Sequence, residues 1–346
     1  MLQYKKRDLS KKVALALDID GVLKHGDTVL PGAKDAIRRL VEKRVPFILL
    51  TNGGGVSEED RAKKLSKQLE AVISPKSLIL GRTPMKALAQ KHADDPILVT
   101  GTNGGHSKIL KDYGFQKVYT VAEVQQWNER IFPFSKLRKE QCTNSLSING
   151  EDIVFKAFFF LQESDDWGRD MQYAIDVMSP PYGSIVAGKP KAGSAEEPLH
   201  EKDRPKLYYA SADLLTPTEG ISRPRLGMGA IKLSLESIYD KLFYPSTGQR
   251  LEEMTVTYGK PSKMTYEYAS QVFEREHGVK KDEYTIWMIG DNPDVDIKGA
   301  NRAGWKSALV KTGVYQKNEM PTEEPTLFVD NVLEAVDKIL ALHSVA

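Results

Sequence analysis

The sequence of 346 residues predicts an α/β fold, with a parallel sheet in one domain and a second α/β domain inserted into it. Three observations support this prediction. Short apolar runs alternate with helical patterns, which favours a parallel sheet covered by helices on both faces. Four of these runs end in polar clusters, as strands do where open α/β sheets bind their ligands. The chain is also long for one hydrophobic core and comfortable for two domains.

The first apolar run, residues 14–17, ends in two carboxylates one residue apart, Asp18 and Asp20, followed by Gly21. Like charges at the end of a buried strand cost free energy through repulsion and desolvation. A divalent cation and a phosphoryl group would offset that cost, because hard cations prefer carboxylate oxygens. The alternative is a strand end whose solvated acids only begin a turn.

The elements that follow continue the alternation of strands and helices. Pro31 opens a helical pattern, residues 47–50 form the second strand, and Ser57 caps a helix with an acidic first turn. Between residues 83 and 242 strand-like runs such as 97–100 still alternate with helical patterns, but they carry no further motif of the phosphate-binding type. This stretch is therefore predicted to form a second domain with its own sheet.

The three later strand ends are also followed by polar groups with a chemical use. The second supplies a hydroxyl, the third a lysine and the fourth further metal-binding acids. These clusters are Thr51-Asn52-Gly53-Gly54-Gly55 after residues 47–50, Gly259-Lys260-Pro261 after residues 254–258, and Gly290-Asp291-Asn292-Pro293-Asp294-Val295-Asp296 after residues 286–289. A second Gly-Lys-Pro contains Lys189, but Lys260 is preferred because it follows a strand and precedes a helical pattern.

In this order, the four segments resemble the motifs of the haloacid dehalogenase (HAD) superfamily of phosphohydrolases. The long insertion resembles that of class IIA, a group with a large C2-type α/β cap that includes p-nitrophenyl phosphatases and pyridoxal phosphatases. Residues 50–55 and 309–315 further resemble the cat eye syndrome critical region hydrolases of mitochondria and fungi. The resemblance implies a doubly wound, Rossmann-like parallel-sheet core formed by residues 1–82 and 246–346, with the α/β cap at residues 83–245.

The resemblance also implies a role for the acidic residues. Asp18 would attack phosphorus and form an aspartyl-phosphate, which water then hydrolyses. Asp20 would act as general acid for the leaving group and then as general base for water. Mg²⁺ would be held by Asp18, the backbone carbonyl of Asp20 and Asp291. Asn292 and Asp296 would orient this metal shell, and Asp296 has an alternative structural role as anchor of the helix that follows.

The remaining clusters would bind the phosphoryl group. Thr51 would donate its hydroxyl to a phosphoryl oxygen, together with the backbone N–H groups of Asn52 and Gly53, because glycine lets the chain approach an anion closely. Lys260 would neutralise the phosphate and Asp18, and so stabilise the charge that develops in the transition state.

Two residues of the predicted cap are candidates for substrate contact. Relatives carry a segment like Thr-Asn-x-Asp in the cap. In this sequence Ser211 replaces the usual asparagine, so Asp213 is the residue of the segment that still matches the family pattern. Arg225 precedes a helical pattern and could help to hold an anion, although a plain loop before a helix explains it equally well. Neither residue identifies a substrate.

The composition argues against several classes of protein. A formal net charge of +2, from 49 basic and 47 acidic residues, argues against a nucleic-acid partner. The single cysteine, Cys142, suits a reducing intracellular compartment. No apolar stretch approaches the roughly 20 residues of a transmembrane helix. Residues 1–12 are basic, but the first strand begins at Val13, so a solvated or trimmed tail is preferred over a transit peptide. The location stays open between mitochondrion, by resemblance, and cytoplasm.

The sequence thus predicts a Mg²⁺-dependent phosphatase that hydrolyses a small phosphorylated metabolite beneath a cap. One alternative is a phosphotransferase or phosphomutase that uses the same aspartyl-phosphate. Another is a non-catalytic protein that binds phosphate or metal as a partner, because fold and residues do not guarantee turnover. A homodimer is also left open, since capped relatives often dimerise.

Overall fold

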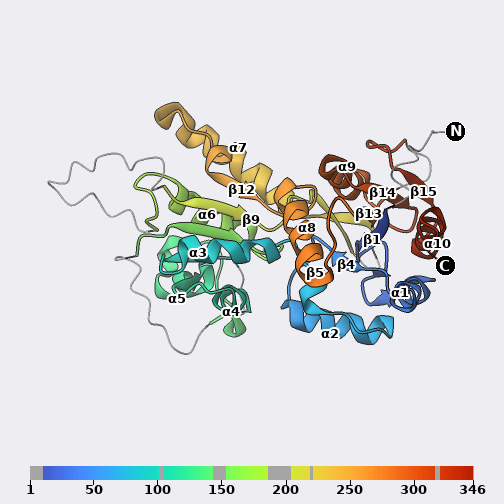
Figure 1. Cartoon of the computed structure of the whole chain (residues 1–346). Coiled ribbons are helices and arrows are strands. Elements are labelled where there is room, and N and C mark those ends of the chain that lie inside the picture. Colours follow the sequence, from blue (N-terminus) through green and yellow to red (C-terminus); the bar gives the residue numbers. More distant parts are fainter. Residues whose placement is uncertain are drawn as a thin grey trace. The chain divides into compact units, whose positions relative to one another are not determined.

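The computed structural model divides into two compact units, which we call the core unit and the cap unit (Figure 1). The core unit comprises Met1–Pro84, Pro217–Pro224 and Gly259–Ala346, and the cap unit comprises Met85–Thr216 and Arg225–Tyr258. The structure describes six stretches of the chain in detail. They are residues 11–100, 105–142, 153–185, 204–218, 221–315 and 320–345.

The core unit is built on a six-stranded sheet in which every neighbouring pair of strands is parallel. The chain winds outward from β1 in both directions, which is the doubly wound arrangement. The predicted parallel-sheet α/β fold is therefore confirmed. In sheet order the strands are β15 (Leu327–Val329), β14 (Lys306–Val310), β13 (Tyr284–Gly290), β1 (Lys12–Leu17), β4 (Phe47–Leu50) and β5 (Leu78–Ile79).

The side chains of β1 show why helices cover both faces of this sheet. Val13, Leu15 and Leu17 pack in one apolar core, whereas Ala14 and Ala16 pack in another. Successive side chains of a strand point to opposite faces, so each core covers one face. The first core includes residues of α1 (Ala33–Glu42), α2 (Glu58–Leu69) and α10 (Val332–Leu342), and the second includes residues of α8 (Lys263–His277) and α9 (Lys298–Ala303).

The cap unit has a five-stranded parallel sheet of its own. In sheet order its strands are β12 (Thr255–Thr257), β9 (Lys206–Tyr209), β8 (Ala157–Phe160), β6 (Ile97–Val99) and β7 (Val118–Thr120). Its helices are α3 (Ala89–His92), α4 (Gly105–Asp112), α5 (Val121–Trp127), α6 (Trp167–Met178) and α7 (Met228–Thr247). A two-stranded sheet of β10 (Leu215–Thr218) and β11 (Ile221–Leu226) precedes α7. Among the described residues, no helix combines the length and apolar character needed to cross a bilayer.

The strand before Lys260 corrects one sequence prediction. All four strand ends were expected at the edge of one sheet, but β12 pairs with β9 of the cap sheet, where Val256 lies opposite Tyr208. The backbone N–H of Tyr258 continues this pairing by donating to the carbonyl of Tyr209. The limits of the cap unit at residues 85 and 258 accordingly differ from the predicted 83 and 245. A run of strand-forming residues does not reveal which of two sheets it joins.

Candidate active site

The end of β1 places Asp18 and Asp20 in a tight turn of the core unit. The backbone N–H of Asp18 donates to the carbonyl of Ile289, so pairing with β13 extends one residue past the strand. The chain then reverses, with the N–H of Gly21 donating to the carbonyl of Lys24. Gly21 has φ of 88°, a left-handed conformation that favours glycine. Sequence and structure thus agree that the acids end a strand.

Asp296 organises the turn that follows β13. Its Oδ2 accepts hydrogen bonds from the backbone N–H groups of Asp291 and Asn292, both at 3.1 Å. Asn292 instead caps the turn locally, because its Oδ1 accepts from the N–H of Asp294 at 3.0 Å. Asp296 therefore has a structural role in the turn that follows β13, beside its place in the ionic cluster, whereas its role as anchor of the following helix stays a prediction.

Lys260 joins the two strand ends through ion pairs. Its Nζ lies 2.8 Å from Oδ1 of Asp18 and 2.7 Å from Oδ1 of Asp296, and the lysine side chain is only 2% exposed. The side chain of Asn52 fixes the backbone of Lys260 in two places. Its Oδ1 accepts from the Lys260 N–H at 2.6 Å, and its Nδ2 donates to the Lys260 carbonyl at 2.9 Å. This use of the Asn52 side chain was not predicted.

The loop after β4 brings Thr51 and Gly53 to the same place as Asp20. The N–H of Gly53 donates to Oγ1 of Thr51 at 3.1 Å, and Thr51 is buried. A Cβ added to Gly53 would lie 3.3 Å from Oγ1 of Thr51 and 3.5 Å from Oδ2 of Asp20. Glycine therefore lets the loop approach Thr51 closely, with Asp20 at ordinary contact distance.

Three carboxylates gather against this single lysine. Within the described residues, Asp18, Asp291 and Asp296 are the one group of three acids, histidines or cysteines whose ligand atoms, all within 4.8 Å of one another, could share a metal ion. Full ionisation would leave two negative charges uncompensated by Lys260. Carboxylate oxygens are the ligands that hard divalent cations prefer, so the donor set fits such an ion.

Burial governs the ionisation of these groups. It raises the pKa of Asp18 well above its ordinary value against the opposing effect of Lys260, and the charges of Asp296 and Asp291 add to the rise. Burial, helped by the charge of Asp296, raises the pKa of Asp291 to about 7. Although burial opposes its charge, Asp18 and Asp296 raise the pKa of Lys260, so the lysine remains a cation at neutral pH. Burial and the neighbouring acids therefore disfavour the ionised forms of Asp18 and Asp291.

The loop after β14 donates hydrogen bonds to Asp291, and the sequence analysis assigned no role to this loop. The N–H of Val314 donates to Oδ2 of Asp291 at 2.6 Å, and the N–H of Tyr315 donates to the Asp291 carbonyl at 3.1 Å. A Cβ on Gly313 would lie 1.9 Å from Oδ2 of Asp291, and one on Gly21 would lie 2.3 Å from the same atom. The carboxylate of Asp291 thus packs against two glycines, Gly21 and Gly313. The presence of glycine at these positions was the only feature of the sequence that could have indicated this close packing.

Two cations that the sequence analysis did not single out flank Asp20. Lys24 places its Nζ 3.4 Å from Oδ1 of Asp20, and Arg61 places Nη2 3.2 Å from Oδ2. Both belong to the core unit, as Asp20 does. Each carboxylate oxygen of Asp20 therefore faces its own cation.

The two predicted cap residues lie in the cap unit. The N–H of Asp213 donates to Oγ of Ser211 at 3.0 Å, and its carbonyl accepts from the N–H of Gly229 at 2.9 Å. A Cβ on Gly227 would lie 2.5 Å from that carbonyl oxygen, so glycine allows the start of α7 to approach this loop. Arg225 is exposed and lies in β11, not in a loop. Substrate contact by Asp213 and Arg225 stays a prediction.

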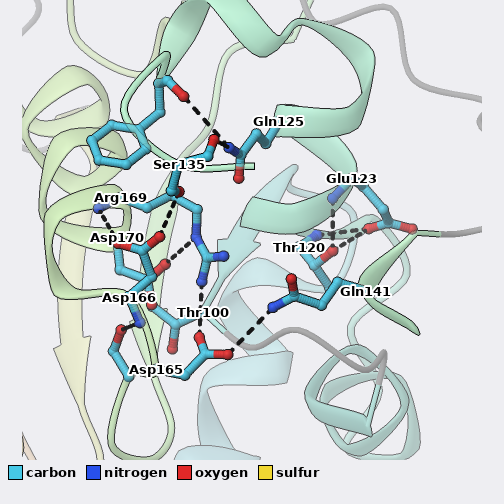
Figure 2. Close-up of polar contacts among 12 residues, drawn as sticks. Thr100, Thr120, Glu123, Gln125, Ser135, Gln141, Asp165, Asp166, Arg169 and Asp170 are labelled. Atoms are coloured by element: carbon cyan, nitrogen blue, oxygen red, sulfur yellow. Dashed lines mark hydrogen bonds and ion pairs between the residues drawn. The ribbon is translucent and has the colours of Figure 1, made fainter. Parts of the chain in front are cut away.

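A second buried ionic cluster lies in the cap unit at the start of α6 (Figure 2). Arg169 directs Nε to Oδ1 of Asp170 at 2.9 Å and Nη2 to Oδ1 of Asp165 at 3.1 Å. Arg138 also pairs with Asp165, at 2.9 Å. Asp166 caps the helix by accepting from the N–H of Arg169 at 3.1 Å. These contacts tie the helix start to neighbouring loops.

Comparison with known proteins places the chain in a family. A family model described as haloacid dehalogenase-like hydrolase matches residues 15–116, and a second HAD-hydrolase-like model matches residues 257–335. A mitochondrial hydrolase of Saccharomyces cerevisiae, YKR070W, is 34% identical over 97% of both chains. This chain belongs to the haloacid dehalogenase-like hydrolases. The predicted family and the prediction of an enzyme of the hydrolase class are thereby confirmed.

Other relatives of this HAD-like hydrolase carry more specific names. A cardiolipin synthase (CMP-forming) / mitochondrial hydrolase fusion protein of Schizosaccharomyces pombe is 32% identical over 96% of this chain, which spans 53% of the fusion protein. The 5'-nucleotidase YutF of Bacillus subtilis is 22% identical over 93% of this chain and 97% of its own length. A 4-nitrophenylphosphatase from Thermotoga maritima has the same fold, with a TM-score of 0.62 and 18% identity over 95% of this chain and 98% of its own.

Proposed function

We propose that this hydrolase is a Mg²⁺-dependent phosphatase that cleaves small phosphomonoesters through an aspartyl-phosphate on Asp18. The observation that carries the proposal is the convergence of three buried carboxyl groups and one lysine at the end of the core sheet, where ionisation of all three acids would leave an excess of negative charge. A purely structural cluster gains nothing from such an imbalance, because uncompensated buried charge costs free energy. A divalent cation and a phosphoryl group would offset it.

The proposed reaction has two displacement steps. A carboxylate oxygen of Asp18 forms a bond to phosphorus while the bond to the leaving oxygen breaks, and Asp20 gives that oxygen a proton. Water then attacks the aspartyl-phosphate, Asp20 takes the proton of the water, and the bond between phosphorus and Asp18 breaks to release inorganic phosphate. Lys260, held at 2.8 Å from Oδ1 of Asp18, neutralises charge in both steps.

The metal ion would be held by Asp18, Asp291 and the backbone carbonyl of Asp20. When bound, it would supply a positive charge that lets the phosphate and the carboxylate approach each other. Asp296 would keep Lys260 and the N–H groups of the turn in place, as its contacts indicate. The phosphoryl oxygens would be received by the loop that contains Thr51, Asn52 and Gly53.

A panel of phosphorylated metabolites, assayed with Mg²⁺ and with a chelator, tests this function. Phosphate release from at least one member should require Mg²⁺ and should fall at least about 10⁴-fold in Asp18→Asn. Asp35→Asn is a matched control, because Asp35 pairs with Arg38 on the exposed face of α1. Full activity of Asp18→Asn, or no release from any member, would contradict the proposal.

The names of two relatives favour one class of substrate, the nucleoside 5'-monophosphates. The S. pombe relative joins a hydrolase to a synthase that forms CMP, and the B. subtilis relative is named a 5'-nucleotidase. Hydrolysis of CMP would remove the by-product of the fused synthase. We expect the kcat/KM for CMP to exceed that for sugar phosphates by at least about tenfold, a difference of about 1.4 kcal/mol. A preference for sugar phosphates would contradict this assignment.

A mitochondrial location is proposed on the names of the same relatives. Fractionation of cells that express the tagged full chain should place it with mitochondrial matrix or membrane markers. Its recovery with cytoplasmic markers alone would contradict the location without affecting the chemistry.

A further inference from the structure

Asp20 carries the proton in the proposed reaction, yet its side chain is 38% exposed. An exposed aspartate has several side-chain rotamers, and only some of them place the carboxyl group beside the leaving oxygen. Effective proton transfer requires a separation of about 2.6–3.2 Å between the heavy atoms. A residue that fixes the orientation of Asp20 would therefore affect the rate.

Lys24 and Arg61 hold the two oxygens of this carboxylate from different directions. Lys24 comes from the turn that follows Asp20 and is buried, with its Nζ also donating to the carbonyl of Gly26. Arg61 comes from the first turns of α2 and donates from Nη2 to Oδ2 of Asp20 at 3.2 Å. The carboxylate is thus held at both oxygens by groups that are themselves mostly buried, with side-chain exposures of 5% and 15%.

The start of α2 is anchored firmly enough to serve as the support for Arg61. Ser57 caps the helix by accepting from the N–H of Asp60 at 3.1 Å, and its carbonyl accepts from the N–H of Arg61 at 2.9 Å. The buried Glu58 accepts a hydrogen bond from Oγ1 of Thr83 at 2.8 Å. Helix capping and this buried contact fix the backbone from which the arginine side chain extends.

Arg61 also lies beside the loop assigned to the phosphoryl group. A Cβ on Gly53 would lie 3.8 Å from Nη2 of Arg61 and 3.5 Å from Oδ2 of Asp20. The ion pair between Arg61 and Asp20 therefore lies beside Gly53, in the loop assigned to the phosphoryl group. The competing role for Arg61 is direct binding of a substrate anion, because its Nε is buried and has no hydrogen-bond partner among the described residues.

We propose that Arg61 is a positioning residue that, with Lys24, holds the carboxyl group of Asp20 toward the leaving oxygen. The assignment rests on the proposed phosphatase function. In the step concerned, the bond from phosphorus to the leaving oxygen breaks, its electron pair stays on that oxygen, and the proton of Asp20 moves to it. Arg61 itself touches only Asp20 in this step. Esters with strongly basic leaving oxygens need this proton most, and nitrophenyl esters need it least.

Leaving-group dependence separates positioning from substrate binding. Arg61→Met should lower kcat for glycerol 2-phosphate by about 100-fold, the scale of general acid catalysis, and for p-nitrophenyl phosphate by no more than about threefold. KM should change little for either ester. Arg61→Lys should recover part of the loss, because an ammonium group can still reach a carboxylate. An equal loss with both esters, or a change confined to KM, would overturn the positioning role.

Lys64→Ala is the matched control. Lys64 lies one turn further along α2 and pairs with Asp27 at 2.6 Å, so it links α2 to the segment that follows Asp20 without touching Asp20. Its replacement should leave the ratio of the two kcat values unchanged. A shift of that ratio equal to the one in Arg61→Met would assign the effect to the link between α2 and the segment that follows Asp20, and would overturn the proposal.

Crystal structures provide a test that does not depend on activity. Asp20 should have one orientation in the wild-type protein, with its oxygens facing Lys24 and Arg61, and a changed or multiple orientation in Arg61→Met. An unchanged orientation in the variant would overturn the positioning role. If the wild-type protein hydrolysed no member of the panel of phosphorylated metabolites, the proposed function would fail, while this structural comparison would still decide whether Arg61 orients Asp20.

Discussion

The core and cap units each contain a buried cation between two carboxylates, and only one of these clusters fits a catalytic role. Lys260 lies between Asp18 and Asp296 in the core unit. Arg169 lies between Asp165 and Asp170 in the cap unit (Figure 2). Both cations have side chains that are 2% exposed. Burial and pairing alone therefore do not identify a functional site.

The two clusters differ in charge balance. In the cap unit a second arginine, Arg138, shares Asp165, and the third acid, Asp166, is satisfied by a helix N-terminus and by the hydroxyl of Ser135. In the core unit three acids that could share an ion face one lysine. The cap cluster therefore has two cations for three acids and the core cluster has one cation for three, so full ionisation would leave the larger surplus of negative charge in the core unit. We infer that surplus charge is the property that separates the two.

Removing the cation from each cluster should give opposite results, and this is the largest expected effect. Lys260→Met should lower kcat by about 10³-fold, because it removes charge stabilisation from the transition state. Arg169→Met should instead destabilise the fold by about 3–5 kcal/mol, the cost of leaving the buried carboxylate of Asp170 unpaired. Steady-state kinetics and denaturant unfolding measure the two effects. Loss of activity per folded molecule in Arg169→Met, with stability unchanged, would reverse the comparison.

A methyl group on Gly313 should affect the core cluster alone. Its Cβ would lie 1.9 Å from Oδ2 of Asp291, so Gly313→Ala should displace this carboxylate and weaken Mg²⁺ binding by about 10–100-fold, as loss of a supporting contact does. Gly278→Ala is the control, because an added Cβ there meets nothing within 4 Å, although φ of 64° strains the backbone. Calorimetric titration with Mg²⁺ distinguishes them. Equal Mg²⁺ affinities in the two variants would contradict the claim that close packing against Gly313 holds the Asp291 carboxylate in place.

Mg²⁺ binding should depend on pH through the surplus acids. Because Asp291 has a pKa of about 7 in the metal-free protein, it must lose a proton before it can bind a cation. The apparent affinity should therefore fall as pH decreases below 7, by up to about tenfold per pH unit for one displaced proton. Titration at pH 6 in buffers of different ionisation enthalpy should detect proton release. Identical affinity at pH 6 and pH 8 would show that Asp291 is already ionised without metal.

In the cap unit pH should act on stability, with the smallest effect of the series. Burial raises the pKa of Asp176 on α6 to about 6, so the folded state binds more protons than the unfolded state between about pH 4 and pH 6. Its contribution to stability is full below that interval and is lost as pH rises through 6. Asp176→Asn should therefore raise the melting temperature relative to wild type by about 2–4 °C at pH 7, with no gain at pH 4. A gain that is the same at both values would contradict the shifted pKa.

The sequence predicted the parts of this structure that depend on local pattern. Apolar alternation indicated the strands of the core sheet, and carboxylates at strand ends indicated where Asp18, Asp291 and Asp296 would meet, because parallel strands end at one edge. Lys260 lies at this edge, with Nζ 2.8 Å from Oδ1 of Asp18, while the other candidate, Lys189, lies outside the described residues. The strand before Lys260 was assigned to the wrong sheet, since periodicity describes a strand but not its partner.

Contacts between distant side chains were not predictable in the same way. Asn52 holds the backbone of Lys260 across 208 positions of sequence, and its amide resembles any other polar group in a glycine-rich loop. Arg61 is one charged residue among several on an amphipathic helix, and only the fold shows that it faces Asp20. A glycine at position 313 indicated that another group can approach the backbone closely. That this group is Asp291 depends on the packing of two loops, which the sequence does not show.

The central claim is that Asp18 becomes transiently phosphorylated, and a crystal structure with Mg²⁺ and beryllium fluoride tests it most directly. The trifluoroberyllate group, which mimics a phosphoryl group on aspartate, should be bonded to the carboxylate of Asp18, with Mg²⁺ in contact with Asp18 and Asp291. A fluoride complex seated away from Asp18, or a structure without either ligand at this position, would contradict the account.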